Sequence, residues 1–267
     1  MTGSLGLISA ASAGAVLLLV LLAFAAGMAL RRHNVADIAW GLGFAVVAVV
    51  SLLISAGHGL PARRLLLAAV TVIWGLRLAG HIFRRSRGGG EDPRYAELLG
   101  KAKGHPAWYA LRTVYLGQGA LIWVISLPVQ VGMLAARPLT PLLVIGGLAW
   151  LCGLFFEAVG DYQLERFKAV PANRGQIMTR GLWRYTRHPN YFGDACMWWG
   201  LFGLSYGSPV QLVTVVSPLL MTFVLTRGTG QRMTDRRMAG SRPGFAAYAA
   251  RTSGFIPLPP RRPRTGS

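Results

Sequence analysis

The sequence predicts an all-α, polytopic membrane protein with about seven transmembrane helices. Of its 267 residues, 53% are hydrophobic and only 14% are charged, whereas soluble domains carry about 25% charged residues. The apolar residues lie in continuous blocks of about 20, the length at which a helix crosses a bilayer. These blocks do not show the alternating pattern of a transmembrane β-barrel. Composition and pattern therefore favour a bundle of membrane helices.

Seven apolar blocks account for most of the chain. The last two are short, and the Tyr206–Pro209 turn between them predicts a helical hairpin. We expect one integral membrane domain over residues 1–257 and a disordered, Pro/Arg-rich tail over 258–267. The predicted helices cover residues 10–30, 37–56, 65–83, 114–135, 141–158, 190–206 and 209–226.

Basic residues are divided unevenly between the two sides of this bundle. The loops after the first, third and fifth helices and the C-terminal segment hold 24 of the 28 Lys and Arg residues. The positive-inside rule places these segments in the cytoplasm and the N-terminus outside. The net charge of +19 then faces anionic lipid headgroups and any anionic cofactor, so no nucleic-acid partner is expected. We expect an integral protein of the bacterial plasma membrane, whose oligomeric state stays open.

Ionisable residues at or within membrane helices mark candidate sites, because burying a charge in a bilayer is costly. The first group lies at the end of the fifth helix, where Glu157, Asp161 and Lys168 fall close to one helical face. Its carboxylates could accept hydrogen bonds from ribose or amide groups, and Lys168 could pair with phosphate. An ordinary solvated face of a helix leaving the membrane explains the same spacing.

The second group opens the sixth helix. Pro189 suits the first turn of a helix, where free N–H groups bind anions. Asn190 and Asp194 are four residues apart and point the same way within an apolar helix. A positive-inside anchor with interfacial aromatic residues explains the arginines, but not the buried Asn and Asp. We therefore favour a binding site that is formed by Arg184, Arg187, His188, Asn190, Tyr191 and Asp194.

The third group lies on the second and third helices. Asp37 and Trp40 open the second helix, while Arg77 and His81 are four residues apart on the third. Arg77 falls about mid-helix, where a charge needs an acidic partner or a wet cavity. Asp37 is a candidate partner for Arg77, and a purely structural ion pair is the alternative interpretation.

Several motifs resemble an uncharacterised bacterial membrane family related to the C-terminal domain of steroid 5-alpha-reductase. The most specific is Arg-His-Pro-Asn-Tyr-Phe-Gly at residues 187–193. The resemblance runs from about residue 34 to 257, although Asp194 and Asp235 stand where the family pattern has Glu. Further matches are Asp-Ile-Ala-Trp-Gly at 37–41, Asp-Pro-Arg-Tyr at 92–95, Asp-Tyr-Gln-Leu at 161–164 and Arg-Thr-Ser-Gly-Phe-Ile-Pro at 251–257.

This resemblance implies a seven-helix fold that binds NADPH between the later helices and their cytoplasmic loops. By this analogy the cofactor would contact Asp161, Asn190 and Asp194, and its phosphates would lie near Lys168, Arg184 and Arg187. The implied activity is reduction of an activated carbon–carbon double bond in a lipid-soluble substrate, such as an enone steroid, sterol or polyprenoid.

Such a reduction places negative charge on the substrate carbonyl oxygen, which requires a hydrogen-bond donor or acid. His81 and Tyr115 are the candidates for this donor, with Asp37 orienting it or sharing the proton. The residues of the second and third helices, including Trp40 and Arg77, would face the substrate.

Two other classes of function stay open. The Arg-His-Pro-x-Tyr-x-Gly pattern also occurs in membrane isoprenylcysteine carboxyl methyltransferases, which bind S-adenosylmethionine. The many arginines around residues 180–187 favour a phosphate-bearing dinucleotide over that cofactor. A non-enzymatic scaffold or transporter is the third alternative, although the paired repeats of many transporters are not detectable. No metal site is expected, because Cys152 and Cys196 lack metal-ligand spacing.

Overall fold

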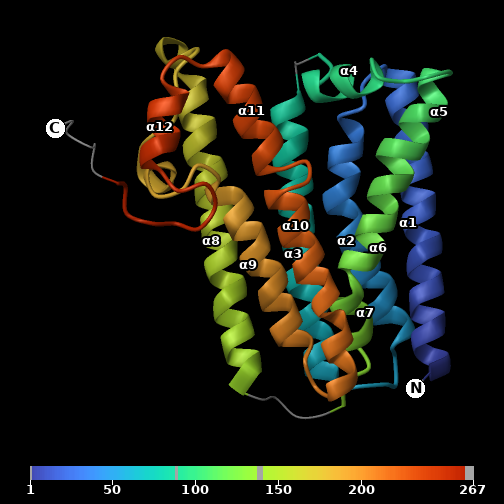
Figure 1. Ribbon diagram of the computed structural model, residues 1–267. Helices are drawn as coiled ribbons and strands as arrows, with labels where there is room; N and C mark the ends of the chain where they lie inside the picture. Colours follow the sequence, from blue (N-terminus) through green and yellow to red (C-terminus); the bar gives the residue numbers. More distant parts are fainter. Residues whose placement is uncertain (1, 88–89, 137–140, 262–267) are drawn as a thin grey trace. The chain divides into compact units, whose positions relative to one another are not determined.

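The computed structural model describes residues 2–87, 90–136 and 141–261, and these ranges are mostly helical (Figure 1). They contain no strand, and a single isolated β-bridge joins Thr186 to Ser253. The chain divides into two compact units. Unit 1 consists of Met1–Leu143 and Leu204–Ser217, and unit 2 of Val144–Gly203 and Pro218–Ser267.

Unit 1 contains three long helices and a fourth membrane-length stretch that is broken into shorter elements. Prolines stand in the first turns of several of these elements, where their missing N–H costs nothing. The elements are α1 (Thr2–Leu30), α2 (Val35–Ile54), α3 (Pro61–Ser86), α4 (Pro93–Leu99), α5 (Pro106–Ala110), the π-helical η1 (Leu111–Leu116), α6 (Gly117–Ile125), α7 (Leu127–Gly132) and the 3-10 helix η4 (Pro209–Val215).

Unit 2 contains most of two long helices and the short elements that follow them. Its elements are α8 (Pro141–Ala169), the 3-10 helices η2 (Pro171–Asn173) and η3 (Gly181–Arg184), α9 (Pro189–Ser205), α10 (Val216–Thr226), α11 (Gln231–Ser241) and α12 (Phe245–Arg251).

Six helical stretches in the described ranges are long and apolar enough to cross a membrane, which supports the predicted membrane class. The helix predicted over residues 190–206 is present as α9, but it has 17 residues, fewer than the roughly 20 that a full crossing usually needs. Length and hydropathy therefore identify six candidate crossings in these ranges, and α9 falls slightly short of a seventh. The six are Gly3–Leu30, Val35–Ile54, Pro61–Ser86, Pro106–Gly132, Pro141–Ala169 and Pro209–Ser241.

In unit 1, α2 and α3 meet at a pair of glycines. A Cβ atom on Gly41 would lie 2.6 Å from the carbonyl oxygen of Gly75, so the two backbones approach closely. Small residues permit such approaches between membrane helices. Beside this contact, the Phe44 ring packs against that of Trp74, with 5.3 Å between centroids. This packing holds α2 beside α3, with Asp37 in the first turn of α2.

In unit 2, glycines also join α8 to α9. A Cβ atom on Gly193 would lie 2.5 Å from the carbonyl oxygen of Gly153, and one on Gly160 would lie 3.1 Å from Pro189. Later residues of α8 therefore meet earlier residues of α9, so the two helices run antiparallel. We call this contact the α8–α9 seam.

The first residues of the predicted tail make two backbone hydrogen bonds. The Leu258 N–H donates to the Tyr185 carbonyl at 3.0 Å, and the Arg261 N–H donates to the Arg251 carbonyl at 2.9 Å. The remainder of the predicted tail, residues 262–267, lies outside the described residues.

Candidate functional site

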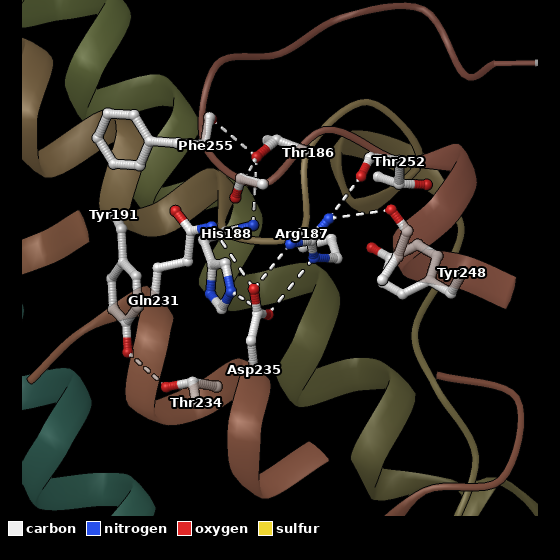
Figure 2. Close-up of polar contacts among 12 residues, drawn as sticks. Thr186, Arg187, His188, Tyr191, Gln231, Thr234, Asp235, Tyr248, Thr252 and Phe255 are labelled. Carbon is white, nitrogen blue, oxygen red and sulfur yellow. Dashed lines mark hydrogen bonds and ion pairs between the residues drawn. The ribbon is translucent and has the colours of Figure 1, made fainter. Parts of the chain in front are cut away.

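Asp235 on α11 is the centre of a charged cluster in unit 2 (Figure 2). One carboxylate oxygen accepts from Nη2 of Arg187 at 2.7 Å, and the other lies 2.9 Å from Nε2 of His188. The His188 ring stacks on the ring of Tyr191, three residues further on. The two rings are parallel, with 5.1 Å between their centroids. The Tyr191 hydroxyl lies 3.4 Å from that of Thr234. The start of α9 is thus held against α11 by charge and a hydroxyl pair.

The segment after α12 closes over the same cluster. The Arg187 guanidinium donates to the Thr252 carbonyl at 2.7 Å, and its backbone N–H donates to the Ser253 carbonyl at 2.9 Å. The Thr186 hydroxyl donates to the Phe255 carbonyl at 2.8 Å. On α12, the Tyr248 hydroxyl donates to the Trp183 carbonyl, and burial raises the pKa of this phenol. These bonds fasten the C-terminal segment to the stretch preceding α9.

Polar side chains predicted to bind a cofactor do lie together along the α8–α9 seam. Glu157 and Asp161 are buried on α8, with side chains that are 3% and 6% exposed. The Asn190 amide on α9 donates to Asp161 at 3.2 Å. Asp194 follows the seam residue Gly193 and is also buried. The seam therefore brings three carboxylates and one amide to a single helix contact.

The cationic residues predicted near cofactor phosphates have different surroundings. Lys168 and Arg184 are exposed, at the end of α8 and in η3 respectively. Arg187 is half-buried and directs its guanidinium at Asp235 and at the carbonyls of Ala249 and Thr252. A phosphate contact by Arg187 stays a prediction, while the structure gives this residue a role in holding the C-terminal segment.

Asp37 is the centre of a separate cluster in unit 1. Its carboxylate accepts from Nη2 of Arg94 at 2.7 Å and from the Tyr95 hydroxyl at 2.6 Å. Arg94 also pairs with Asp92, whose side chain caps α4 by accepting from the Arg94 N–H. Burial raises the pKa of the Tyr95 phenol, and the Asp37 charge raises it further. Asp37 therefore pairs with Arg94, whereas Arg77 was its predicted partner.

Tyr115 lies in the π-helical turn η1, and its ring is only 1% exposed. Its hydroxyl lies 3.1 Å from Nδ1 of His33, which follows α1 in the chain. The His33 backbone N–H donates to Glu91 at 2.6 Å. Single π-helical turns within α-helices are rare and are frequent at functional sites. The turn presents a buried phenol to an imidazole, which is an arrangement suited to proton transfer.

The other unit 1 predictions concern α2 and α3. His81 is buried and Arg77 is half-buried, one turn apart on α3. Trp40 is half-buried on α2, where its ring meets that of Phe44 edge-on at 5.2 Å. The hydrogen bonds described for Asp37 and Tyr115 are with Arg94, Tyr95 and His33, and not with His81, Arg77 or Trp40.

A surface cavity of about 230 Å³ opens beside the Asp37 cluster. Its lining combines three carboxylates with polar and basic groups and includes Asn34, Asp37, Arg85, Ser86, Glu91 and Asp92. Three of the nine acidic residues of a strongly basic chain thus border one hollow.

Several residues that complete these clusters had no predicted role. Asp235, Arg94, Tyr95 and Thr252 lie in stretches that carried the family resemblance, so their motifs were a usable signal. His33 and Glu91 stand in loops with no periodicity, and nothing in the sequence joins them to Tyr115.

Comparison with known proteins identifies the family. Residues 23–252 match the family described as "Protein of unknown function (DUF1295)", and the chain belongs to it. A stretch of 135 residues is 30% identical to the cobalt-zinc-cadmium resistance protein CzcN of Cupriavidus metallidurans. That match covers 51% of each chain, so this chain spans about half the length of the relative. No solved structure matches the chain significantly.

Proposed function

We propose that this DUF1295 protein is a membrane reductase that uses NADPH to reduce an activated carbon–carbon double bond in a lipid-soluble substrate such as an enone. We place it in the bacterial plasma membrane with seven crossings, its N-terminus outside and its C-terminal segment in the cytoplasm. The resemblance of residues 187–193 to the steroid 5-alpha-reductase domain supports the reaction class.

Unit 2 supplies residues that fit the cofactor. The buried carboxylates and amide of the α8–α9 seam, Glu157, Asp161, Asn190 and Asp194, can accept from or donate to ribose and carboxamide groups. Exposed cations such as Lys168 and Arg184 offer charge to phosphates. NADPH, when bound, supplies the hydride. The chain's own part is to bind and orient the cofactor and to keep His188 and Tyr191 in place through Asp235.

The buried Tyr115 hydroxyl in unit 1 is the observation that carries the proposal. When an enone accepts a hydride at its β-carbon, the electron pair moves to the carbonyl oxygen, which then needs a donor. Tyr115 is a neutral phenol shielded from solvent and held at a fixed position by η1 and His33. It can donate its proton there. Transfer of a methyl group to a nucleophile needs no such acid, which favours reduction over methyl transfer.

Ligand-dependent thermal unfolding of the detergent-purified protein tests the proposal. NADPH, NADH and S-adenosylmethionine are added separately, each at about a hundred times its dissociation constant. A ligand that binds only the folded state then adds roughly 2.7 kcal/mol to the free energy of unfolding. We expect stabilisation by NADPH. A shift with S-adenosylmethionine alone would establish the methyltransferase alternative, and no shift with any of the three would contradict both enzymes.

Two variants separate cofactor binding from chemistry. Asn190→Ala removes the seam amide and should reduce the stabilisation by NADPH. Tyr115→Phe should keep that stabilisation but lower the rate of enone reduction by about a hundredfold or more, the usual contribution of a general acid. A Tyr115→Phe protein with wild-type turnover would remove Tyr115 from the mechanism.

A further inference from the structure

The Tyr115 hydroxyl is confined on several sides within unit 1. The edge of the Phe24 ring packs against Tyr115 with 5.3 Å between centroids. Gly27, one turn later on α1, has no side chain, and a methyl group at this position would overlap the Tyr115 hydroxyl. The only described hydrogen-bond partner of that hydroxyl is Nδ1 of His33, at 3.1 Å. The position of the phenol oxygen is therefore fixed by this packing and by His33.

His33 is itself held in place. Its backbone N–H donates to Glu91 at 2.6 Å, and the same carboxylate accepts from the Asp92 N–H at 3.0 Å. The ring is half-buried and lies 5.8 Å from the Tyr115 ring and 6.4 Å from the Tyr95 ring. The imidazole thus has a fixed position between a buried phenol and a partly open surface.

The cavity lies beside His33. Glu91, which holds His33, lines the cavity, and so does Asn34, the next residue in the chain. Histidine exchanges protons near neutral pH, whereas a phenol buried in a membrane helix has no direct access to solvent. A Tyr115 that gives up its proton in each turnover needs a route by which to regain it, and His33 is its only described polar neighbour.

We propose that His33 is the positioning residue of Tyr115 and the group that returns its proton, an inference that rests on the proposed reductase function. The Tyr115 O–H bond breaks as a bond from the proton to the substrate carbonyl oxygen forms. The phenolate then takes the Nδ1 proton of the His33 imidazolium. Neutral His33 regains a proton from water in the cavity, so water is the net source of the proton consumed in reduction.

Tyrosine labelled with ¹³C at Cζ reports the hydrogen bond directly by NMR, and the signal missing in Tyr115→Phe identifies Tyr115. His33→Phe removes the hydrogen-bond partner of the phenol and should move this signal. Gly27→Ala should move it from the opposite side by displacing the hydroxyl. Gly14→Ala is the matched control, because residue 14 lies on the same helix with no atom near its added methyl group, and it should leave the signal unchanged.

His33→Gln separates positioning from proton return. Its side-chain amide can still hydrogen-bond the phenol oxygen but cannot deliver a proton, so the Tyr115 signal should stay near wild type. The kcat for NADPH oxidation with 2-cyclohexenone as the probe should fall about tenfold or more in both His33 variants. The stabilisation by NADPH should not change, because the proposed cofactor contacts do not include His33.

The outcomes distinguish this inference from the proposed function. An unchanged Tyr115 signal in His33→Phe overturns the inference whatever NADPH does. Wild-type turnover in His33→Gln overturns the return of the proton by His33 but leaves its positioning role. A wild-type protein that NADPH does not stabilise overturns the reductase itself, and the NMR signal still shows whether His33 holds Tyr115.

Discussion

At the scale of single residues, Asp235 joins segments that are far apart in the sequence. It binds Arg187 and His188, which precede α9, and through Arg187 it reaches the carbonyl of Thr252. The Arg187 and Asp235 side chains are 14% and 18% exposed, so solvent screens their attraction only partly. Removing one member of such a pair leaves the other charge desolvated without compensation, which costs more than the pair itself contributes.

Asp235→Asn should therefore destabilise the protein. The amide keeps one acceptor oxygen but loses the charge that Arg187 and His188 share, and we expect the free energy of unfolding to fall by about 2–4 kcal/mol. Thermal unfolding followed by tryptophan fluorescence measures the change. Glu97→Gln is the control, because its pair with Lys101 is 62% and 65% exposed and contributes roughly 0–1 kcal/mol. Equal losses in the two variants would contradict the role of Asp235.

Tyr95 gives a pH-dependent prediction at the same scale. Burial and the Asp37 charge raise the pKa of the Tyr95 phenol above its ordinary value, which is about 10. Below pH 10 the phenol is neutral in both states, so its contribution to stability is fully present. Above pH 10 the unfolded chain loses the proton first, and the free energy of unfolding should fall by up to about 1.4 kcal/mol per pH unit.

The comparison with Tyr95→Phe isolates this effect from the other tyrosines. The variant should be less stable than wild type at pH 7, because it lacks the hydrogen bond to Asp37. The difference between the two proteins should shrink as the pH rises above 10. A difference that stays constant between pH 9 and 11 would show that the Tyr95 phenol titrates alike in both states.

The sequence could point to Asp37 and Tyr115 because polar groups in apolar helices are conspicuous. It could not show their partners. Arg77 was the predicted partner of Asp37 because the two lie in neighbouring helices. The ion pair of Asp37 is instead with Arg94 on the short α4. Which residues pair depends on where the segment between two long helices packs against the helix ends. The hydropathy of the sequence does not indicate that position.

At the scale of elements, the α8–α9 seam depends on Gly193. A Cβ atom there would lie 2.5 Å from the backbone nitrogen of Glu157 and from the carbonyl oxygen of Gly153. Both are backbone atoms, which cannot rotate away as a side chain can. Overpacking of this kind costs typically 1–3 kcal/mol, more than the roughly 1 kcal/mol by which alanine exceeds glycine in helix propensity.

Gly193→Ala should therefore lower the melting temperature and weaken the stabilisation by NADPH, since the seam carries the proposed cofactor contacts. Gly80→Ala is the matched control, because residue 80 lies within α3 with no atom near the added methyl group. That substitution should leave the melting temperature unchanged or raise it. A Gly193→Ala protein at least as stable as Gly80→Ala would show that the seam tolerates a wider helix spacing.

The long helices were predictable because continuous apolar runs determine where a chain can cross a bilayer. The breaks within them were not. The stretch predicted as one helix over 114–135 is divided among η1, α6 and α7. A π-helical turn changes the backbone hydrogen-bond pattern without changing hydropathy, so the position of Tyr115 could not be derived from periodicity. The glycines of the α8–α9 seam can be read from the sequence, but the residues they contact are determined by helix packing.

At the scale of the whole molecule, the composition and the six membrane-length helical stretches indicate a membrane protein. The number of crossings is left to experiment. Six stretches reach full membrane length, whereas the 17 residues of α9 span about 26 Å at 1.5 Å per residue. This is slightly less than a hydrocarbon core of about 30 Å, and local thinning of the bilayer accommodates such a mismatch at modest cost.

The parity of the crossings decides between six and seven, since an odd number places the two termini on opposite sides. Because the positive-inside rule favours a cytoplasmic C-terminal segment, we expect green fluorescent protein fused after residue 261 to fluoresce and alkaline phosphatase fused there to be inactive. The same reporters at the N-terminus should give the reverse pattern. Matching patterns at both ends would mean that α9 does not cross. The Asn190 and Asp194 side chains would then belong to a re-entrant helix, which enters and leaves the membrane on the same side.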